Sequence, residues 1–324
     1  MIIGAEMAAW LAAPERRAAS RDRADAFARR WSELPFIQDL RLELDALRPK
    51  SADAVLAAAE RLMRRTGDIR RLVRELIGEA RDPFFQPPFL VLTSDIASGI
   101  MLYDDENVTI SVGVTGADAL AAKKSGERGP ASIHFNGLRT VFHFLKAGGA
   151  TLSFWEAPPI ADHPGGGEGA RCRLVERRRI DDGERVALDG RTQSFVIEHA
   201  TSDIVCIQAA VHAEGAPLAV EYDCRSLEFV GASSTDEGTS RVQMMVSLIR
   251  AMDRRDAAPV LEELLAGSDF YTRWYIMREL LALDAEAALP GLRRMAATDA
   301  HPEVRDAAAA TLATFFGDAR EQAA

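Results

Sequence analysis

RVALDGRTQSFVIEHATSDIVCIQAAV, residues 185–211, is the stretch that decides the fold. Three runs that suit β-strands follow one another here, and the turn residues Asp189-Gly190 and Ser202-Asp203 separate them. The last run alternates between two sets of side chains, Val205, Ile207, Ala209 and Val211 against Ile204, Cys206, Gln208, Ala210 and His212. Because successive side chains of a strand point to opposite faces, this pattern predicts a buried strand with two partly apolar faces.

Similar short runs extend this pattern over most of residues 131–230. Their ranges are 131–135, 138–145, 150–157, 171–180, 218–223 and 226–231, and a further hairpin is expected at 98–114. Glycine, Asn and Asp stand between several of the runs and supply the positive φ angles of tight hairpins. Many short strands at this spacing predict an antiparallel β-sandwich or barrel.

The turn at 180–200, followed by IVCIQAAV at 204–211, resembles the first motif of the cupin superfamily, the RmlC-like jelly rolls. That motif has a Gly, five residues and then His-x-His, with a Glu soon after. Here Gly183 is followed by five residues, Asp189 and Arg191 stand where the two histidines would be, and Glu198 comes later than the motif's Glu. The resemblance implies a cupin-like barrel that lacks the usual metal ligands.

The C-terminal third carries an internal repeat. Arg241, Arg273 and Arg305 are each 32 residues apart, and the same offset links Met245, Met277 and Ala309, and Leu248, Leu280 and Leu312. Helical segments that recur at such a period indicate an α-solenoid, in which each hairpin packs on the next. The stretch DAHPEVRDAAAATL, residues 299–312, resembles HEAT repeats of the armadillo-type fold at Asp299, Pro302, Val304, Arg305, Ala308 and Leu312. The resemblance implies a scaffold or a surface for protein interaction.

The first 80 residues are expected to form helices, at 15–34, 36–47, 51–66 and 69–80. Their apolar stripes bury against each other or the barrel, and a homodimer interface is a second option. The phenylalanines of the connector DPFFQPPF (82–89) are expected to pack on the β domain. The chain is therefore predicted to be an α+β multidomain protein. Its segments are N-terminal helices (1–82), a central antiparallel cupin-like β-sandwich or barrel (83–235) and a C-terminal α-solenoid of HEAT-like repeats (236–324).

Composition limits the partners and the compartment. The net charge of −10 argues against nonspecific nucleic-acid binding, which depends on basic surface. No apolar run is long enough to span a membrane, and the N-terminal stretch lacks the basic n-region of a signal peptide. Cys172, Cys206 and Cys224 follow neither a metal nor a disulfide spacing. We therefore expect a cytoplasmic protein that binds neither nucleic acid nor membranes.

Two candidate sites follow from the polar residues of the β domain. Arg191, Gln193, His199 and Gln208 are placed to line a barrel mouth and hydrogen-bond a small polar ligand. His134, His143, His199 and His212 are the candidate ligands of a divalent metal, since neighbouring strand-like runs carry them. No HxH, HxxxH or HxxE pattern supports the metal site, and no cofactor is expected. The glycine-rich loop HPGGGEG, at 163–169, is interpreted as a strand connection that could close the barrel mouth.

Two functions remain open at this point. The first is a non-catalytic regulatory protein that binds a small-molecule ligand in the degenerate barrel, or a protein partner through the HEAT-like repeats. The alternative is a metal-dependent cupin enzyme of the oxygenase type with atypical His and Glu ligands. No nucleophile elbow or dinucleotide fingerprint points to another enzyme class.

Overall fold

The computed structural model describes residues 4–125, 132–159 and 169–316. They form two compact units, which we call unit 1 and unit 2. Within the described ranges, unit 1 comprises residues up to 125, 138–156 and 174–215, and unit 2 comprises 132–137, 157–159, 169–173 and 216–316. The glycine-rich loop at 163–169 lies outside the described residues except for Gly169.

Unit 1 begins with five helices, whose limits are set by local sequence. They are α1 (Ala5–Ala12), α2 (Pro14–Ser32), α3 (Pro35–Ala46), α4 (Ala52–Met63) and α5 (Thr66–Glu79). Pro14 and Pro35 each open a helix, where the missing N–H of proline has no partner to lose. The Ser51 hydroxyl caps α4 by accepting a hydrogen bond from the Ala54 N–H at 3.3 Å. The four helices predicted within residues 15–80 are thus confirmed, and α1 was not foreseen.

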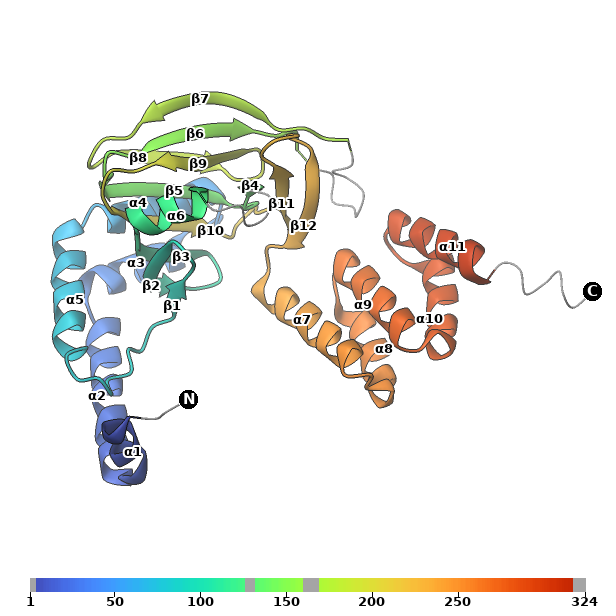
Figure 1. The fold of residues 1–324 in the computed structure, drawn as a ribbon, viewed down its shortest axis with the longest axis horizontal. Coiled ribbons are helices and arrows are strands. Elements are labelled where there is room, and N and C mark those ends of the chain that lie inside the picture. The colour runs from blue at the N-terminus through green and yellow to red at the C-terminus, as the bar shows by residue number, and fades with distance from the viewer. Residues whose placement is uncertain (1–3, 126–131, 160–168, 317–324) are drawn as a thin grey trace, which may run out of the picture. The chain divides into compact units, whose positions relative to one another are not determined.

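Two antiparallel sheets make up the rest of unit 1 (Figure 1). The six-stranded sheet has the order β1 (Val91–Thr93), β2 (Ala97–Asp104), β3 (Val108–Thr115), β10 (Ile204–Val211), β5 (Arg139–Lys146) and β8 (Arg185–Asp189). The three-stranded sheet has the order β7 (Arg173–Arg179), β6 (Thr151–Glu156) and β9 (Gln193–His199). A short helix, α6 (Ala117–Ser125), follows β3 and contacts β9.

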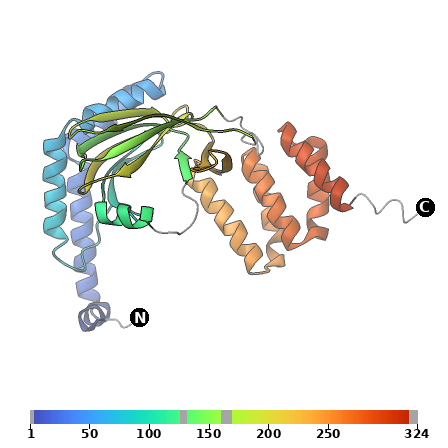
Figure 2. The same cartoon turned by 45° about the horizontal axis from the view of Figure 1, so that its top comes forward.

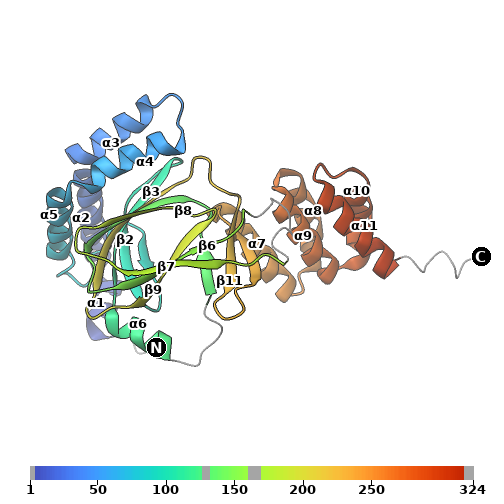
Figure 3. The same ribbon diagram turned by 90° about the horizontal axis from the view of Figure 1, so that it is seen from above.

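The central strand β10 of the six-stranded sheet is covered on both faces, as the alternation along residues 204–211 predicts. Ile207, Ala209 and Val211 belong to a core shared with α2–α5, and α4 contacts β10, β5 and β3. Figure 3 shows α3 and α4 beside the strands of unit 1. On the other face, Ile204 belongs to a second core between the two sheets, with Cys206 packed against it. The N-terminal helices therefore bury their apolar stripes on the sheet.

The phenylalanines of the connector DPFFQPPF contact aromatic rings of the N-terminal helices. Phe85 and Phe89 place their ring centroids 5.8 and 5.7 Å from that of Phe27 on α2, and Phe84 stacks on Trp10 of α1 at 5.2 Å. Edge-to-face contacts between aromatic rings are favourable. The helices offer such partners. Phe85 also belongs to the core that the helices share with β2, β3 and β10, so the prediction that the phenylalanines pack on the β domain is met through that shared core.

Unit 2 combines a small sheet with five helices (Figures 1 and 2). The sheet has the order β12 (Phe229–Ser234), β11 (Leu218–Asp223) and β4 (Ser132–Phe135). The helices are α7 (Glu237–Ala251), α8 (Ala258–Gly267), α9 (Phe270–Leu283), α10 (Ala285–Thr298) and α11 (Pro302–Phe316), with a 3₁₀ turn at Arg255–Ala257. Asp236, Asp269 and Asp284 cap α7, α9 and α10 through their carboxylates.

The helical repeat is held by a buried apolar core and by an ion pair. Arg273 of α9 forms a two-pronged ion pair with Asp299, at 3.0 and 2.8 Å, and its repeat equivalent Arg305 donates to the Asp299 carbonyl at 2.6 Å. Both arginines thus anchor the loop before α11. The prediction of stacked helical hairpins is confirmed.

The three segments predicted from the sequence, 1–82, 83–235 and 236–324, stay a prediction, because a compact unit is not the same as an independently folding domain. Unit 1 joins the N-terminal helices to the larger sheets, while β4, β11 and β12 group with the C-terminal helices. Among the helices of the described residues, none combines the length and hydrophobicity that crossing a membrane requires.

Candidate functional site

A cavity of about 360 Å³ lies in unit 1, on the face of the six-stranded sheet that is turned toward the three-stranded sheet. The first five strands of the larger sheet line it together with β9. The lining residues at its inner end, Phe144 and Ile204, are buried, whereas Thr93, Ser98 and Val114 are exposed and mark its opening. Ligand sites are typically clefts of roughly 300–1,000 Å³, so the cavity is large enough for a small molecule.

Strand register decides which side chains reach the cavity. Cys206 of β10 lies directly between Gly113 of β3 and Phe144 of β5, and Gln208 lies between Ser111 and Phe142. Residues opposite each other in an antiparallel sheet share a face, so these two rows form the floor of the cavity. Gly113 leaves part of that floor open: a Cβ built there would meet nothing nearer than the Ser98 carbonyl oxygen, at 3.4 Å.

The lining of the cavity is apolar and uncharged. Its aromatic residues are Phe142, Phe144 and Phe195, and its polar groups are the Gln208 amide, the Cys206 thiol and the hydroxyls of Thr93, Ser94, Ser98, Ser111 and Thr115. Among the described residues that line it, none is Asp, Glu, Lys, Arg or His. Burial raises the pKa of the Cys206 thiol to about 12. That thiol is therefore protonated at neutral pH and is a poor nucleophile.

Of the four candidate ligand-binding residues, the structure places Gln208 in the cavity. Within the described part of the chain, no hydrogen bond joins its side chain to another residue, so the amide is available to a ligand. His199 is exposed at the end of β9. Gln193 lines a separate hollow of about 340 Å³ beside Trp155 and Arg178. The structure does not bring the four residues together. The prediction that they bind one ligand remains untested.

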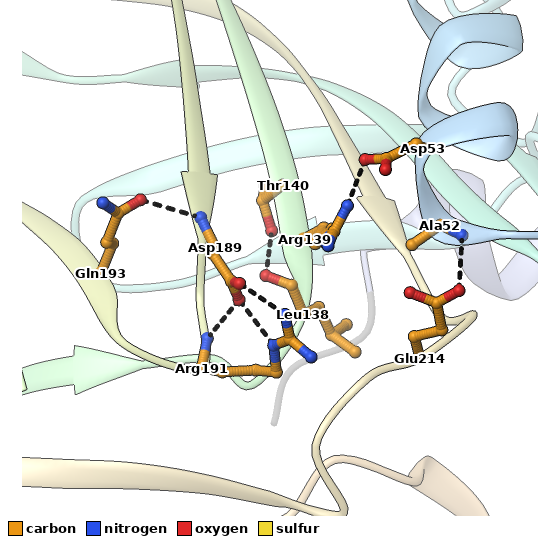
Figure 4. Close-up of polar contacts among 9 residues, drawn as sticks. All are labelled: Ala52, Asp53, Leu138, Arg139, Thr140, Asp189, Arg191, Gln193 and Glu214. Atoms are coloured by element: carbon orange, nitrogen blue, oxygen red, sulfur yellow. Dashed lines mark hydrogen bonds and ion pairs between the residues drawn. The ribbon is translucent and has the colours of Figure 1, made fainter. Parts of the chain in front are cut away.

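Arg191 forms an ion pair with Asp189, two positions before it (Figure 4). Its guanidinium donates to both carboxylate oxygens of Asp189, at 2.8 and 2.6 Å, and its backbone N–H adds a third bond at 3.2 Å. These hydrogen bonds hold the pKa of Asp189 below its ordinary value. The two residues that stand where the cupin pattern places its histidines thus neutralise each other. Arg139 makes a similar pair with Asp53 nearby.

The four candidate metal ligands occupy different surroundings. His134 belongs to unit 2 and lies 3.6 Å from Glu221, while the other three belong to unit 1. His143 lies on the same face of β5 as Val141, which packs against the helices, and the His212 Nε2 lies 2.9 Å from the Thr109 hydroxyl. Across the described ranges, no group of three or more His, Cys, Asp or Glu side chains is placed to hold a metal ion. The metal site stays an untested prediction.

Sequence reasoning missed the aromatic residues of the cavity. Phe142 and Phe144 alternate along β5 with Val141 and His143, a signal that places both on one face. The face of β5 that is turned to the second sheet is set by the pairing of β5 with β10, which lies about 60 residues later in the chain. No local sequence pattern contains that pairing. Phe195 joins them from β9, with its ring centroid 4.8 Å from that of Phe142.

Comparison with known proteins gives a sequence match in unit 2 and structural similarities for the strand-rich part. The HEAT repeat family matches residues 237–314. An ectoine synthase from P. lautus is 11% identical, with 38% of this chain and 69% of that chain covered and a TM-score of 0.24. A cupin domain from Bordetella pertussis Tohama I is also 11% identical, with 38% and 99% covered and a TM-score of 0.23. HutD from Pseudomonas fluorescens SBW25 is 15% identical, with 38% and 56% covered and a TM-score of 0.25.

No curated protein matches the chain at a significant level. The resemblance to HEAT repeats inferred from residues 299–312 is confirmed by the family match. The structures that resemble the β region include a cupin domain, and these similarities concern the fold alone. The chain thus joins a strand-rich β region to a C-terminal stretch that matches the HEAT repeat family.

Proposed function

We propose that the protein is a non-catalytic regulatory protein that binds a small molecule in the cavity of unit 1 and a protein partner through its HEAT repeats. The observation that carries the first part is the cavity itself, with about 360 Å³ of space, an apolar aromatic lining and a single amide from Gln208. Binding sites for small molecules typically combine an apolar wall with a few polar groups in this way.

The chemistry of the lining supports binding without catalysis. General acid–base catalysis needs a titratable side chain within hydrogen-bond reach of the reacting group. The described lining residues offer hydroxyls, one amide and the Cys206 thiol, whose pKa of about 12 keeps it protonated. The serines and threonines of the cavity have no imidazole or carboxylate beside them in that lining to activate them.

The second part of the proposal rests on the helical array. Repeats of this kind form extended surfaces that are suited to protein partners. The net charge of −10 argues against nucleic acid as that partner. The three free cysteines fit the cytoplasmic location that we expect. The expected option of a homodimer can be examined by light scattering on the full-length protein.

A thermal-shift screen of small molecules tests the cavity as the binding site. A ligand that binds only the folded state raises the unfolding midpoint. We expect ligands that stabilise the wild type and fail to stabilise Gly113→Val, whose side chain fills part of the cavity floor. The matched control is Gly231→Val on β12, where an added Cβ meets nothing within 4 Å. Ligands that stabilise both variants equally, or no ligand at all, would contradict the proposal.

A further inference from the structure

The floor of the cavity contains a row of residues that crosses five strands. Leu92 of β1 pairs with Gly99 of β2, Gly99 with Gly113 of β3, Gly113 with Cys206 of β10, and Cys206 with Phe144 of β5. All five residues line the cavity. Two adjacent glycines in the middle of this row leave the backbone of the sheet bare, between the side chains of Leu92 and Cys206.

The bare segment presents backbone to the cavity and lacks side chains at Gly99 and Gly113. At Gly99, an added Cβ would lie 2.6 Å from the Val112 carbonyl oxygen and 3.0 Å from the Gly113 Cα, so β2 and β3 approach too closely there for any side chain. A group that rests on this floor lies against peptide planes instead of between side chains. Planar groups fit such a surface better than branched aliphatic groups do.

The aromatic side of the cavity favours the same shape. Phe195 of β9 stands edge-on to Phe142, at 4.8 Å and 74°, and lies 6.2 Å from Phe144. Aromatic rings prefer offset-stacked or edge-to-face neighbours. An aromatic ligand in this cavity therefore finds aromatic partners on β5 and β9 as well as the two glycines of the floor.

Gln208 is the side-chain amide among the polar groups of the cavity, and it can bond a polar group of a ligand. Gln208 lies in the neighbouring row, between Ser111 and Phe142, and its amide supplies both a donor and an acceptor. A hydroxyl or amide group on the ligand satisfies either atom. An ionised group has no counterpart, since the described lining residues include no charged side chain and an unpaired buried charge is strongly disfavoured.

The volume sets the size of the ligand. An apolar cavity of roughly 150 Å³ holds one benzene molecule, and this cavity measures about 360 Å³. We infer that the cavity binds an uncharged, planar aromatic molecule of about two fused rings with one hydrogen-bonding group, seated on Gly99 and Gly113 and bonded to Gln208. This inference rests on the proposed function, because it names the class of ligand for the same cavity.

Three matched probes test the inference: naphthol, which is neutral and carries a hydroxyl, naphthalene, which lacks the polar group, and naphthoate, which is anionic. The fluorescence of the naphthalene ring reports the binding of each probe to the full-length protein at neutral pH. We expect naphthol to bind most tightly and naphthoate not to bind at concentrations up to the millimolar range. A hydrogen bond between neutral groups makes naphthol roughly three- to tenfold tighter than naphthalene.

Two variants locate the probe. Gly113→Val is expected to weaken naphthol at least tenfold, whereas Gly231→Val leaves its affinity unchanged. Gln208→Leu keeps the volume of the site and removes its amide, so naphthol should fall to the affinity of naphthalene while naphthalene itself is unaffected. Circular dichroism of each variant separates loss of binding from loss of folding. If Gly113→Val does not fold, Gly113→Ala and Gln208→Leu give the same comparison.

The outcomes separate the two proposals. If naphthoate binds as well as naphthol and Gly113→Val abolishes both, the cavity is a ligand site but the inferred class of ligand is wrong. If no probe binds, or if binding is unaffected by Gly113→Val, the inference fails. The proposed binding of small molecules in this cavity fails as well only if the thermal-shift screen also yields no ligand that depends on Gly113. A preference for naphthol over naphthalene that disappears in Gln208→Leu, together with no binding of naphthoate, supports both.

Discussion

Gly99 and Gly113 are neighbours across β2 and β3, yet the structure constrains them differently. A Cβ at Gly99 meets the backbone of Val112 at 2.6 Å, and a carbonyl oxygen in a paired strand cannot move aside. A Cβ at Gly113 has its closest contact at 3.4 Å, which is near ordinary van der Waals distance. Close strand approach therefore requires glycine at the first position, and the open cavity benefits from glycine at the second.

We expect Gly99→Ala to lower the free energy of unfolding by about 1–3 kcal/mol, the usual range for overpacking. Gly113→Ala should change it by less than about 1 kcal/mol, because its Cβ fits without a backbone shift. Urea unfolding followed by circular dichroism measures both. Equal losses in the two variants would show that the strands yield at Gly99 and that the close approach is not a constraint.

His143 is a second residue whose surroundings have a measurable effect. Burial lowers its pKa below the ordinary value of 6.5, and the cation of Arg185, its cross-strand neighbour, adds to the shift, while the Met63 backbone opposes it. Arg185 in turn lies 3.7 Å from Glu60 of α4. Within the described residues the buried His143 Nδ1 has no hydrogen-bond partner, which fits a neutral ring.

Stability should therefore fall on acidification. Above pH 6.5 the ring is neutral in both states and contributes nothing; below it, the unfolded chain takes up a proton that the folded protein does not. The free energy of unfolding then drops by up to about 1.4 kcal/mol per pH unit until the lowered pKa is reached. We expect His143→Leu to remove this part of the pH dependence, measured by urea unfolding at about pH 5 and about pH 7. Identical pH dependence in both proteins would contradict it.

At the scale of elements, α7 departs from the repeat that its sequence follows. Met277 and Leu280 of α9 are fully buried, at 0% exposure, whereas their equivalents Met245 and Leu248 on α7 are 61% and 57% exposed. Helix α9 lies inside the array and packs against α7, α8 and α10. Helix α7 begins the array and turns Val242, Val246 and Ile249 toward the helical core instead. The same sequence positions thus have different energetic roles.

Matched substitutions in the two helices measure this difference. Met277→Ala removes a fully buried side chain and should cost about 2–5 kcal/mol. Met245→Ala removes an exposed one and should change stability by no more than about 0.5 kcal/mol. Thermal unfolding followed by circular dichroism gives both values. A comparable loss from Met245→Ala would mean that α7 is covered in solution.

The elements were largely predictable because their patterns are local. The helices at residues 15–80, the hairpin at 98–114 and the two faces of 204–211 follow from periods that a short window of sequence contains. The strand β1 was missed because three residues carry too little pattern, and Pro87 and Pro88 before it suggest a connector. The sequence repeat predicted the solenoid but not the exposure of α7. The repeated positions look alike in every copy, whereas burial depends on whether a copy lies inside the array or at its end.

The site was less predictable, because it depends on pairings between distant strands. Gln208 was found because the alternation of its strand set it apart from Ile207 and Ala209. Arg191 was proposed as a polar residue at the expected barrel mouth, and the structure pairs it with Asp189. Gly99 and Gly113 act only through the register that puts them side by side, which the sequence of either strand does not specify.

For the whole molecule, the division into two units predicts separable effects. All residues that line the cavity belong to unit 1, and Met277 belongs to unit 2. We therefore expect Met277→Ala to lower the unfolding midpoint of the repeats and to leave the affinity for naphthol unchanged. Fluorescence titration below the unfolding temperature of the variant provides the test. A changed affinity would reveal energetic coupling between the units.

The open floor at Gly113 also makes the cavity adjustable. Since an added Cβ there meets no close neighbour, Ala, Val and Leu at this position would reduce the space above the sheet in graded steps. Such a series measures the size of a bound ligand. The largest side chain at position 113 that still allows a compound to bind shows how much of the cavity volume that compound occupies. Substitution at this single position could thus make the cavity selective for smaller ligands, with the strand pairing around it intact.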